Sequence, residues 1–288
     1  MSNDSLLKDV TDTAFWVATY RAIESERSDA IFRDPFARLL VGDRGQKISD
    51  SMGKISRYTE WSVVSRTVII DRFIEKALKE GVDAIINLGT GLDTRPYRMN
   101  LPASLEWVEA DYPKIIAHKS LILKGEKPRC RLTRFEVDLA DAEKRRAFLD
   151  GVVPHAKKVL VLTEGVIPYL SPEQVTELGN DLFARPRFTY WITEYFHKKV
   201  YRYLKATVRT LSMKNAPFKF YPDDWYGFFR SLNWVEKETR YSGEVALEFK
   251  RKPPMPKMAA LVFRFLPKKV KVEAMRMAGY VVFERARN

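Results

Sequence analysis

Residues 84–95 read AIINLGTGLDTR, a short and mainly apolar run followed by two glycines. A run of this length bounded by a glycine turn is typical of a buried parallel strand. Two glycines at a strand's end let the backbone turn tightly and let a ligand approach where a Cβ atom would clash. Because ligands of open α/β sheets bind outside the carboxyl ends of the strands, Gly89 and Gly91 are candidate binding residues, although such turns also occur for structural reasons alone.

The chain around this segment alternates between helix-like and strand-like patterns. Apolar residues recur at helical spacing in residues 13–24 and 63–80, and Gly81 is expected to end the second helix. Further patterns predict strands at 105–110, 134–139, 159–163 and 188–193, and helices at 112–124, 142–151 and 171–185. Strands that alternate with helices indicate βαβ units and a mainly parallel sheet.

The last third of the chain is less regular. The patterns predict helices at 197–214 and 223–232 and strands at 234–241 and 280–284. These two strands would form an antiparallel pair at the end of the parallel sheet. Between them, residues 257–278 form a basic, partly amphipathic stretch that follows three prolines.

The composition excludes several classes of protein. Hydrophobic residues make up 45% and charged residues 30% of the 288, an ordinary globular balance, and the longest apolar runs are far too short to cross a bilayer. Residues 1–10 have no apolar segment of the kind a signal peptide needs. The single cysteine, Cys130, permits no internal disulfide, and no two histidines are spaced as metal ligands. We therefore expect a cytoplasmic protein without a metal site.

The net charge of +13 is concentrated in one part of the chain. Residues 1–196 contain 29 Lys/Arg and 29 Asp/Glu, whereas residues 197–288 contain 21 Lys/Arg and 8 Asp/Glu, which accounts for the whole excess. This asymmetry fits a surface that faces an acidic substrate, a phosphate-bearing partner or a membrane surface, and it fits equally a solvated surface without a partner.

Acidic residues follow the predicted strands after the glycine turn. Asp111 lies 20 residues beyond Gly91, where an acid would accept hydrogen bonds from both hydroxyls of a ribose. Thr94 stands where a dinucleotide fingerprint has its third glycine, which argues against NAD or FAD. Ribose recognition without pyrophosphate recognition indicates an adenosine cofactor that lacks phosphates.

Two further strand ends could complete the same site. Asp138 could accept a hydrogen bond from the exocyclic amine of adenine, while Leu139 offers its backbone; Glu164 follows the fourth predicted strand. Each acid could instead be an ordinary cap at the end of its strand. A glycine turn or an acid after each of four successive strands nevertheless predicts one shared crevice.

Five motifs in this order and spacing resemble the leucine carboxyl methyltransferase family, in particular its bacterial branch of S-adenosylmethionine-dependent O-methyltransferases. They are SRT at 65–67 with Asp71, GTGLDTR at 89–95, EADYP at 109–113, VDL at 137–139 and TEGVIPYL at 163–170. The segments ATYRA at 18–22 and FRDPFA at 32–37 fit the same branch, so that the resemblance covers roughly residues 13–180.

The resemblance implies a Rossmann-like class I methyltransferase fold that binds S-adenosylmethionine. It implies a helical cap over residues 1–80 and a methyltransferase domain over 81–288, in which 197–278 are insertions on the acceptor side. It also implies roles for single residues: the methionine carboxylate would bind Arg66 and, as a second cation, Arg21; the other cofactor-binding residues would be Gly89, Gly91, Asp111, Asp138, Leu139 and Glu164. Arg66 suits its role because a planar guanidinium pairs with a carboxylate through two parallel hydrogen bonds, although it could instead pair with Glu60 or Asp71 on its own helix.

Methyl transfer to oxygen requires the protein mainly to position the reacting atoms. The acceptor oxygen, the methyl carbon and the sulfur must align, and good positioning alone can supply roughly 7–11 kcal/mol. A carboxylate acceptor needs no base at pH 7, whereas a hydroxyl acceptor needs one within hydrogen-bond reach. Glu194, Tyr195 and Tyr169 are the candidate catalytic residues, and the two tyrosines could equally belong to the core.

The sequence thus predicts an O-methyltransferase that acts on a carboxyl or hydroxyl group of a small-molecule acceptor, acidic or otherwise. Methylation of a protein's C-terminal carboxylate stays open, as does an NAD-type oxidoreductase, which Thr94 disfavours. A third alternative is a basic module that binds membranes or nucleic acid through residues 257–278, where Pro267 interrupts the helical pattern. No RNA-binding motif is visible, so that we expect neither a nucleic-acid partner nor stable insertion into a membrane.

Overall fold

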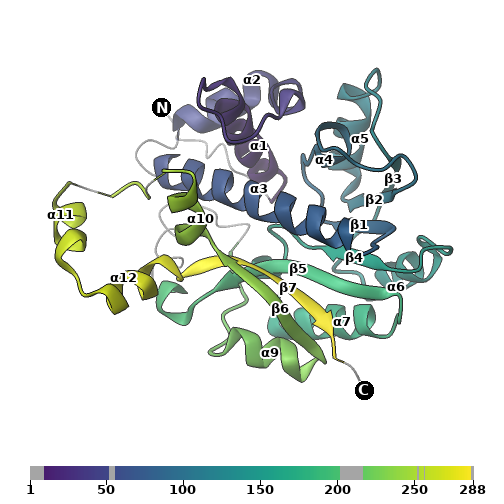
Figure 1. The fold of residues 1–288 in the computed structure, drawn as a ribbon. Helices are drawn as coiled ribbons and strands as arrows, with labels where there is room; N and C mark the ends of the chain where they lie inside the picture. Colours follow the sequence, from purple (N-terminus) through teal and green to yellow (C-terminus); the bar gives the residue numbers. More distant parts are fainter. Residues whose placement is uncertain (1–9, 52–55, 202–216, 252, 256, 287–288) are drawn as a thin grey trace.

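A computed structural model of the chain describes residues 10–51, 56–201, 217–251, 253–255 and 257–286. In this part of the chain seven strands form one sheet (Figure 1). The strands are β1 (Ala84–Leu88), β2 (Glu106–Asp111), β3 (Arg131–Glu136), β4 (Val159–Leu162), β5 (Phe188–Phe196), β6 (Trp234–Tyr241) and β7 (Ala278–Arg285). Their order in the sheet is β3-β2-β1-β4-β5-β7-β6.

The strand directions confirm the predicted mainly parallel sheet with an antiparallel pair at its end. Strands β3, β2, β1, β4 and β5 pair in parallel, and β7 lies antiparallel between β5 and β6. The chain leaves β1 toward β2 on one side and returns to β4 on the other. Such a switch point is where open α/β sheets bind their ligands, between the carboxyl ends of the two strands.

Helices cover both faces of the sheet (Figure 1). They are α1 (Val10–Glu26), α2 (Pro35–Ser51), α3 (Ser56–Lys79), α4 (Arg95–Arg98), α5 (Pro113–Ile122), α6 (Ala142–Gly151), α7 (Pro172–Phe183), α9 (Trp225–Ser231), α10 (Ser242–Glu248), α11 (Lys257–Phe265) and α12 (Lys268–Met275), with the 3-10 turns η2 (Ile167–Tyr169) and η3 (Lys198–Val200). None of the helices in the described ranges is long and apolar enough to cross a membrane.

The apolar side chains of β1 explain why this strand is buried on both sides. Ile85 packs with residues of α3 such as Ile70 on one face, whereas Ile86 packs with residues of α7 such as Leu178 on the other. Successive strand residues point to opposite faces, so a strand covered by helices on both sides needs apolar residues at consecutive positions. Residues 84–88, which read AIINL, have this composition.

Local signals set several helix ends at or near the predicted positions. Gly81, in the left-handed region with φ of 88°, follows the end of α3. Ser171 and Gln174 form a reciprocal capping box at the start of α7. The capping box provides hydrogen-bond partners for the first backbone groups of α7, and Gly81 ends the helical conformation after α3. Because these residue types favour such positions, the boundaries can be found from sequence.

The structure corrects the predicted position of the third strand. β3 covers Arg131–Glu136, three residues earlier than 134–139, so Asp138 and Leu139 lie in the loop before α6 rather than in the strand. β3 is an edge strand with mostly exposed or half-buried side chains, and it therefore lacks the apolar pattern that marks β1.

Two predictions in the C-terminal third also change. The helix predicted at 197–214 lies mostly outside the described residues, and its described beginning is the 3-10 turn η3. Residues 257–278 form two helices, α11 and α12, and the start of β7. Pro267 is the N-terminal cap of α12, because proline has no N–H to continue the hydrogen bonding of α11.

Candidate functional site

A crevice of about 510 Å³ lies at the carboxyl ends of the parallel strands, beneath α1 and α3. Nine of the eleven predicted site residues line it: Arg21, Arg66, Gly89, Gly91, Asp111, Leu139, Glu164, Tyr169 and Glu194. Gly89, Asp111 and Glu164, from three of the four predicted strand ends, share this crevice, whereas Asp138 of the remaining one does not line it. Its lining also includes residues of α1, such as Ala14 and Trp16, which the sequence does not single out.

The glycine turn after β1 has a conformation that favours glycine. Gly89 and Gly91 have φ of 68° and 50°, in the left-handed region. A Cβ atom on Gly91 would lie 3.3 Å from the Cβ atom of Ala14, and one on Gly89 would lie 2.4 Å from Cγ2 of Val166. The turn is thus closely covered by α1 and by the segment after β4, and at its two glycines it presents backbone to the crevice.

Asp111, at the end of β2, is joined to this turn. One carboxylate oxygen accepts a hydrogen bond from Gly91 N at 2.6 Å, and the other accepts one from Tyr112 N at 2.7 Å. Each carboxylate oxygen has a second lone pair, which leaves capacity to accept from a ligand. Burial raises the pKa of Asp111 above its ordinary value.

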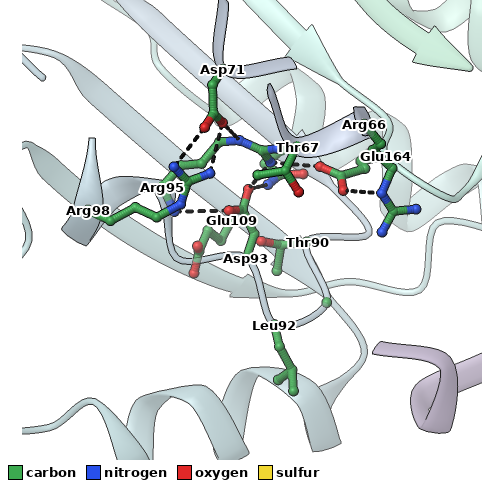
Figure 2. Close-up of polar contacts among 12 residues, drawn as sticks. Arg66, Thr67, Asp71, Thr90, Leu92, Asp93, Arg95, Arg98, Glu109 and Glu164 are labelled. Carbon is green, nitrogen blue, oxygen red and sulfur yellow. Dashed lines mark hydrogen bonds and ion pairs between the residues drawn. The ribbon is translucent and has the colours of Figure 1, made fainter. Parts of the chain in front are cut away.

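Arg66 projects from α3 toward Glu164, which follows β4 (Figure 2). Its Nε atom lies 2.8 Å from Oε1 of Glu164, so that the pairing with Glu60 or Asp71 on its own helix is not what the structure shows. Burial lowers the pKa of Arg66, but the Glu164 carboxylate outweighs this effect and raises the pKa above its usual value. Nε is buried and makes no hydrogen bond of good geometry to the described residues, despite the close ion pair.

The buried side chain of Arg95, which the sequence analysis does not single out, forms ion pairs with residues around the site. Arg95 lies 2.8 Å from Asp93, 2.6 Å from Asp71 and 2.7 Å from Glu164 (Figure 2). It joins the glycine turn to α3 and to the segment after β4. Its position in the GTGLDTR motif is the only local signal, because Asp71 and Glu164 are distant from it in sequence.

Asp71, the aspartate of the SRT motif, pairs with Arg95 and Arg98 and not with Arg66 of its own helix. It accepts from Arg98 as well as from Arg95, and the side chain of Asn87 at the end of β1 donates to Asp93 at 2.8 Å. The GTGLDTR motif and the SRT motif with Asp71 therefore contact each other through the ion pair of Arg95 and Asp71.

A second buried ion pair supports the other side of the turn. Lys119 of α5 lies 2.8 Å from Glu109 of β2, with both side chains inaccessible to solvent, and Arg134 of β3 also lies 2.8 Å from Glu109. Lys119 further donates to the hydroxyl of Thr90 at 3.2 Å. Glu109 of the EADYP motif thus holds the turn in place and is not part of the crevice lining.

Glu194 of β5 is buried and lines the crevice. One carboxylate oxygen accepts from Gly165 N, and the other accepts from the hydroxyl of Thr193 at 2.9 Å. Burial raises the pKa of Glu194 to about 7. Tyr280 of β7, which the sequence analysis does not identify, lies opposite Glu194 in the register of the antiparallel strands β5 and β7. It lines the same crevice.

Two predicted residues lie elsewhere. Tyr195 follows Glu194 along β5 and therefore points to the opposite face of the sheet, where its ring stacks on Tyr226 at a centroid distance of 5.0 Å. Asp138 is not among the lining residues, although Leu139 beside it is, and its carboxylate accepts from Ala140 N at 3.0 Å. Of the three predicted catalytic residues, Tyr195 alone does not line the crevice. Tyr169 remains at the crevice, and burial raises its pKa to about 12.

No group of three or more His, Cys, Asp or Glu side chains suited to a metal ion occurs in the portion of the chain that the structure covers.

The sequence matches the family model for leucine carboxyl methyltransferase over residues 14–182. A protein from Mycobacteroides abscessus named as a candidate S-adenosyl-L-methionine-dependent methyltransferase is 30% identical over 187 residues, which are 59% of this chain and 60% of that protein. A protein from Streptomyces coelicolor with the same description is 34% identical over 178 residues, 58% of this chain and 61% of the relative. The match thus spans about 60% of the length of these curated relatives.

Two solved structures are similar over nearly the whole chain. A DUF574 family protein from Streptomyces avermitilis has a TM-score of 0.57 at 14% identity, with 93% of this chain and 96% of that one covered. A candidate methyltransferase from Thermobifida fusca has a TM-score of 0.55 at 15% identity, with 94% of each chain covered. At these identities the likeness concerns the fold alone, and it confirms the predicted Rossmann-like class I methyltransferase fold.

Proposed function

The chain belongs to the leucine carboxyl methyltransferase family, and from this membership and the crevice we propose that it transfers the methyl group of S-adenosylmethionine to an oxygen atom of a small-molecule acceptor. One observation carries the proposal: the glycine turn, Asp111 and Arg66 surround a single crevice at the switch point of the sheet. The relatives from Mycobacteroides abscessus and Streptomyces coelicolor, named as methyltransferases of this kind, support it.

The residues of the crevice fit the chemical groups of this cofactor. Arg66 brings a guanidinium to the crevice lining, and a planar guanidinium suits the carboxylate of the methionine moiety. Asp111 retains acceptor capacity for the ribose hydroxyls, and the turn at Gly89 and Gly91 allows close approach of the backbone. Leu139 lines the same crevice on the side proposed for adenine.

When bound, S-adenosylmethionine supplies a methyl group on a positively charged sulfonium, which an acceptor oxygen can displace. The contribution of the chain is then positioning and exclusion of water. Residues of α1 and α3 line one side of the crevice, among them Trp16 and Val63. Their place supports the proposal that the N-terminal helices, within residues 1–80, cap the cofactor.

Glu194 favours a hydroxyl acceptor over a carboxyl acceptor. A general base works best when its pKa lies near the working pH, and burial raises the pKa of Glu194 to about 7. In its deprotonated form it can take the proton of a bound hydroxyl as the new oxygen–carbon bond forms. A carboxylate acceptor would need no such residue and would be repelled by a second carboxylate in the same place.

Replacing Glu194 by glutamine is expected to lower kcat/KM for a hydroxyl acceptor by about 10²–10⁴-fold, the usual contribution of a general base. The active form of Glu194 is deprotonated, so wild-type kcat/KM should rise with pH up to about 7 and then level off, whereas the variant should show no such rise. Rate measurements across this pH range test the idea. Glu173→Gln, a change at an exposed glutamate of α7, is the control, and an unchanged profile in Glu194→Gln would exclude this base.

Calorimetric titration tests the cofactor. We expect S-adenosylhomocysteine to bind with a micromolar Kd and to stabilise the protein against thermal unfolding, because it occupies the folded crevice only. Arg66→Gln should weaken this binding, because the amide lacks the charge and the planar fork of the guanidinium. Binding of NAD without any response to S-adenosylhomocysteine would overturn the proposed function.

A further inference from the structure

Helix α11 carries an apolar stripe that faces solvent. Met258, Leu261, Val262 and Phe265 are spaced i, i+3, i+4 and i+7, which places them on one face of the helix, and their exposed fractions lie between 53% and 77%. Figure 1 shows α11 standing away from the sheet, at the far end of the arm that α12 connects to β7. We call α11 and α12 together the basic arm.

The stripe is not explained by the folding of the described chain. An apolar helix face normally packs against the core, and a contiguous exposed one usually marks an interaction surface. Phe263 of α11 and Leu266 directly after it are half-buried, so other apolar residues of this segment are better shielded from solvent than the stripe. The lysine side chain of Lys271 in α12 donates to the carbonyl of Arg264 at 2.8 Å and ties the two helices of the arm together.

Positive charge surrounds this stripe along the chain. Residues 249–272 contain no Asp or Glu and eight cations: Lys250, Arg251, Lys252, Lys257, Arg264, Lys268, Lys269 and Lys271. Arg264, Lys268 and Lys269 are exposed. An apolar stripe bounded by lysine and arginine is the pattern of a helix that lies in the interface of a membrane.

We propose that the basic arm docks on the surface of a membrane that contains anionic phospholipids. Met258, Leu261, Val262 and Phe265 enter the boundary between headgroups and acyl chains, and the lysines that follow Pro267 contact the headgroups. The arm lies on the bilayer and does not span it, because α11 has only nine residues.

Two other partners fit the arm less well. A symmetric dimer through α11 would bring the cations of both copies together, and the chain as a whole carries +13. Nucleic acid would satisfy the cations, but four aliphatic and aromatic side chains in a row along a helix would not contact phosphates. A bilayer with anionic headgroups satisfies both the charge and the apolar stripe.

The position of the arm connects this surface with the crevice. Only Arg276 and Met277 separate α12 from Ala278, which lines the crevice together with Gly279 and Tyr280. Docking of the basic arm would therefore bring Ala278, Gly279 and Tyr280 of the crevice wall close to the bilayer surface.

Flotation of the full chain with phospholipid vesicles tests the proposal. We expect binding to vesicles of equal parts phosphatidylcholine and phosphatidylserine, weak binding to phosphatidylcholine alone, and release at high salt. Phe265→Asp should reduce binding at least about tenfold, and so should the double change Lys268→Glu and Lys269→Glu, because basic residues near such a surface are attracted to its anionic headgroups. Leu121→Asp, at a residue of α5 that is 71% exposed, is the matched control and should bind as the wild type does.

Three outcomes would overturn the proposal. They are absence of binding to the anionic vesicles, equal binding to neutral vesicles, and equal loss of binding in Leu121→Asp and Phe265→Asp. A Phe265→Asp variant that converts a dimer to a monomer, or that loses affinity for single-stranded RNA, while vesicle binding stays unchanged would assign the stripe to those partners instead. Thermal melts should show Phe265→Asp to be as stable as the wild type, because the residue is exposed.

Discussion

Replacing Arg95 by methionine is expected to lower the free energy of unfolding by about 3–5 kcal/mol, the usual effect of removing one partner of a buried ion pair. The change leaves Asp71, Asp93 and Glu164 close together and without the cation that they share. Methionine approximates the length of the arginine side chain and cannot replace its charge. Urea unfolding at pH 7, followed by circular dichroism, gives the difference directly.

Arg230→Met is the matched control for this variant. Arg230 also pairs with a carboxylate, that of Glu236, but its side chain is half exposed. An exposed pair contributes about 0–1 kcal/mol, so the control should unfold close to the wild type. Equal stability of the Arg95 and Arg230 variants would mean that the buried network is unimportant for folding.

The same network predicts how stability depends on pH. Burial raises the pKa of Asp93, but nearby cations, Arg95 foremost, outweigh burial and hold this pKa well below its ordinary range. The pKa of Asp71 is lowered by Arg98 and Arg95, and that of Glu164 by Arg95 and Arg66. A carboxyl whose pKa is lower in the folded state stabilises the fold above its unfolded pKa, near 4, and loses this effect as pH falls. The Arg95 variant should therefore lose less stability than the wild type between pH 5 and about 3.

The parts of the fold that could be predicted are those in which local pattern and tertiary environment agree. β1, α6 and the edge strand β6 have the predicted bounds. β1 is buried on both faces, and α6 begins at an aspartate cap. β3 was placed three residues too late, because an edge strand with exposed side chains has no apolar pattern to mark its start. Sequence reasoning also gave no boundaries for α2, α4 or α10.

In the candidate site too, some residues could be predicted from sequence and others depend on tertiary contacts. The glycine turn, Asp111 and Glu164 follow strand ends, and parallel strand ends meet at one edge of a sheet, so that their convergence follows from topology. The contacts of Arg95 with α3 and with the segment after β4 depend on tertiary packing, which no local pattern reveals.

Glu194 and Tyr195 show a second limit of sequence reasoning. Adjacent strand residues point to opposite faces, so only one of the two could enter the crevice. Both faces of β5 are covered, and both residues are buried, so alternation of polar and apolar residues could not decide between them. The structure selects Glu194 and packs Tyr195 against Tyr226.

Replacing Asp111 by alanine is expected to weaken the binding of S-adenosylhomocysteine by at least about 100-fold, because two hydrogen bonds to a charged acceptor contribute about 1.5–3 kcal/mol each. The carboxylate already accepts from Gly91 N, so its loss also releases the turn that should contact the methionine moiety. Asp111→Asn keeps one acceptor and loses the charge, and it should bind with intermediate affinity. Calorimetry of the three proteins at pH 7.5, with thermal melts to confirm folding, provides the comparison.

The binding measurement also has a pH dependence and a control. Burial raises the pKa of Asp111, so as pH falls the wild type should lose affinity earlier than an ordinary aspartate would allow, and Asp111→Asn should lose none for this reason. Asp150→Ala, at an exposed aspartate of α6 that pairs with Arg185, should bind as the wild type does. If Asp111→Ala is folded and retains wild-type affinity, the ribose does not lie at the end of β2, and the position proposed for the cofactor is wrong.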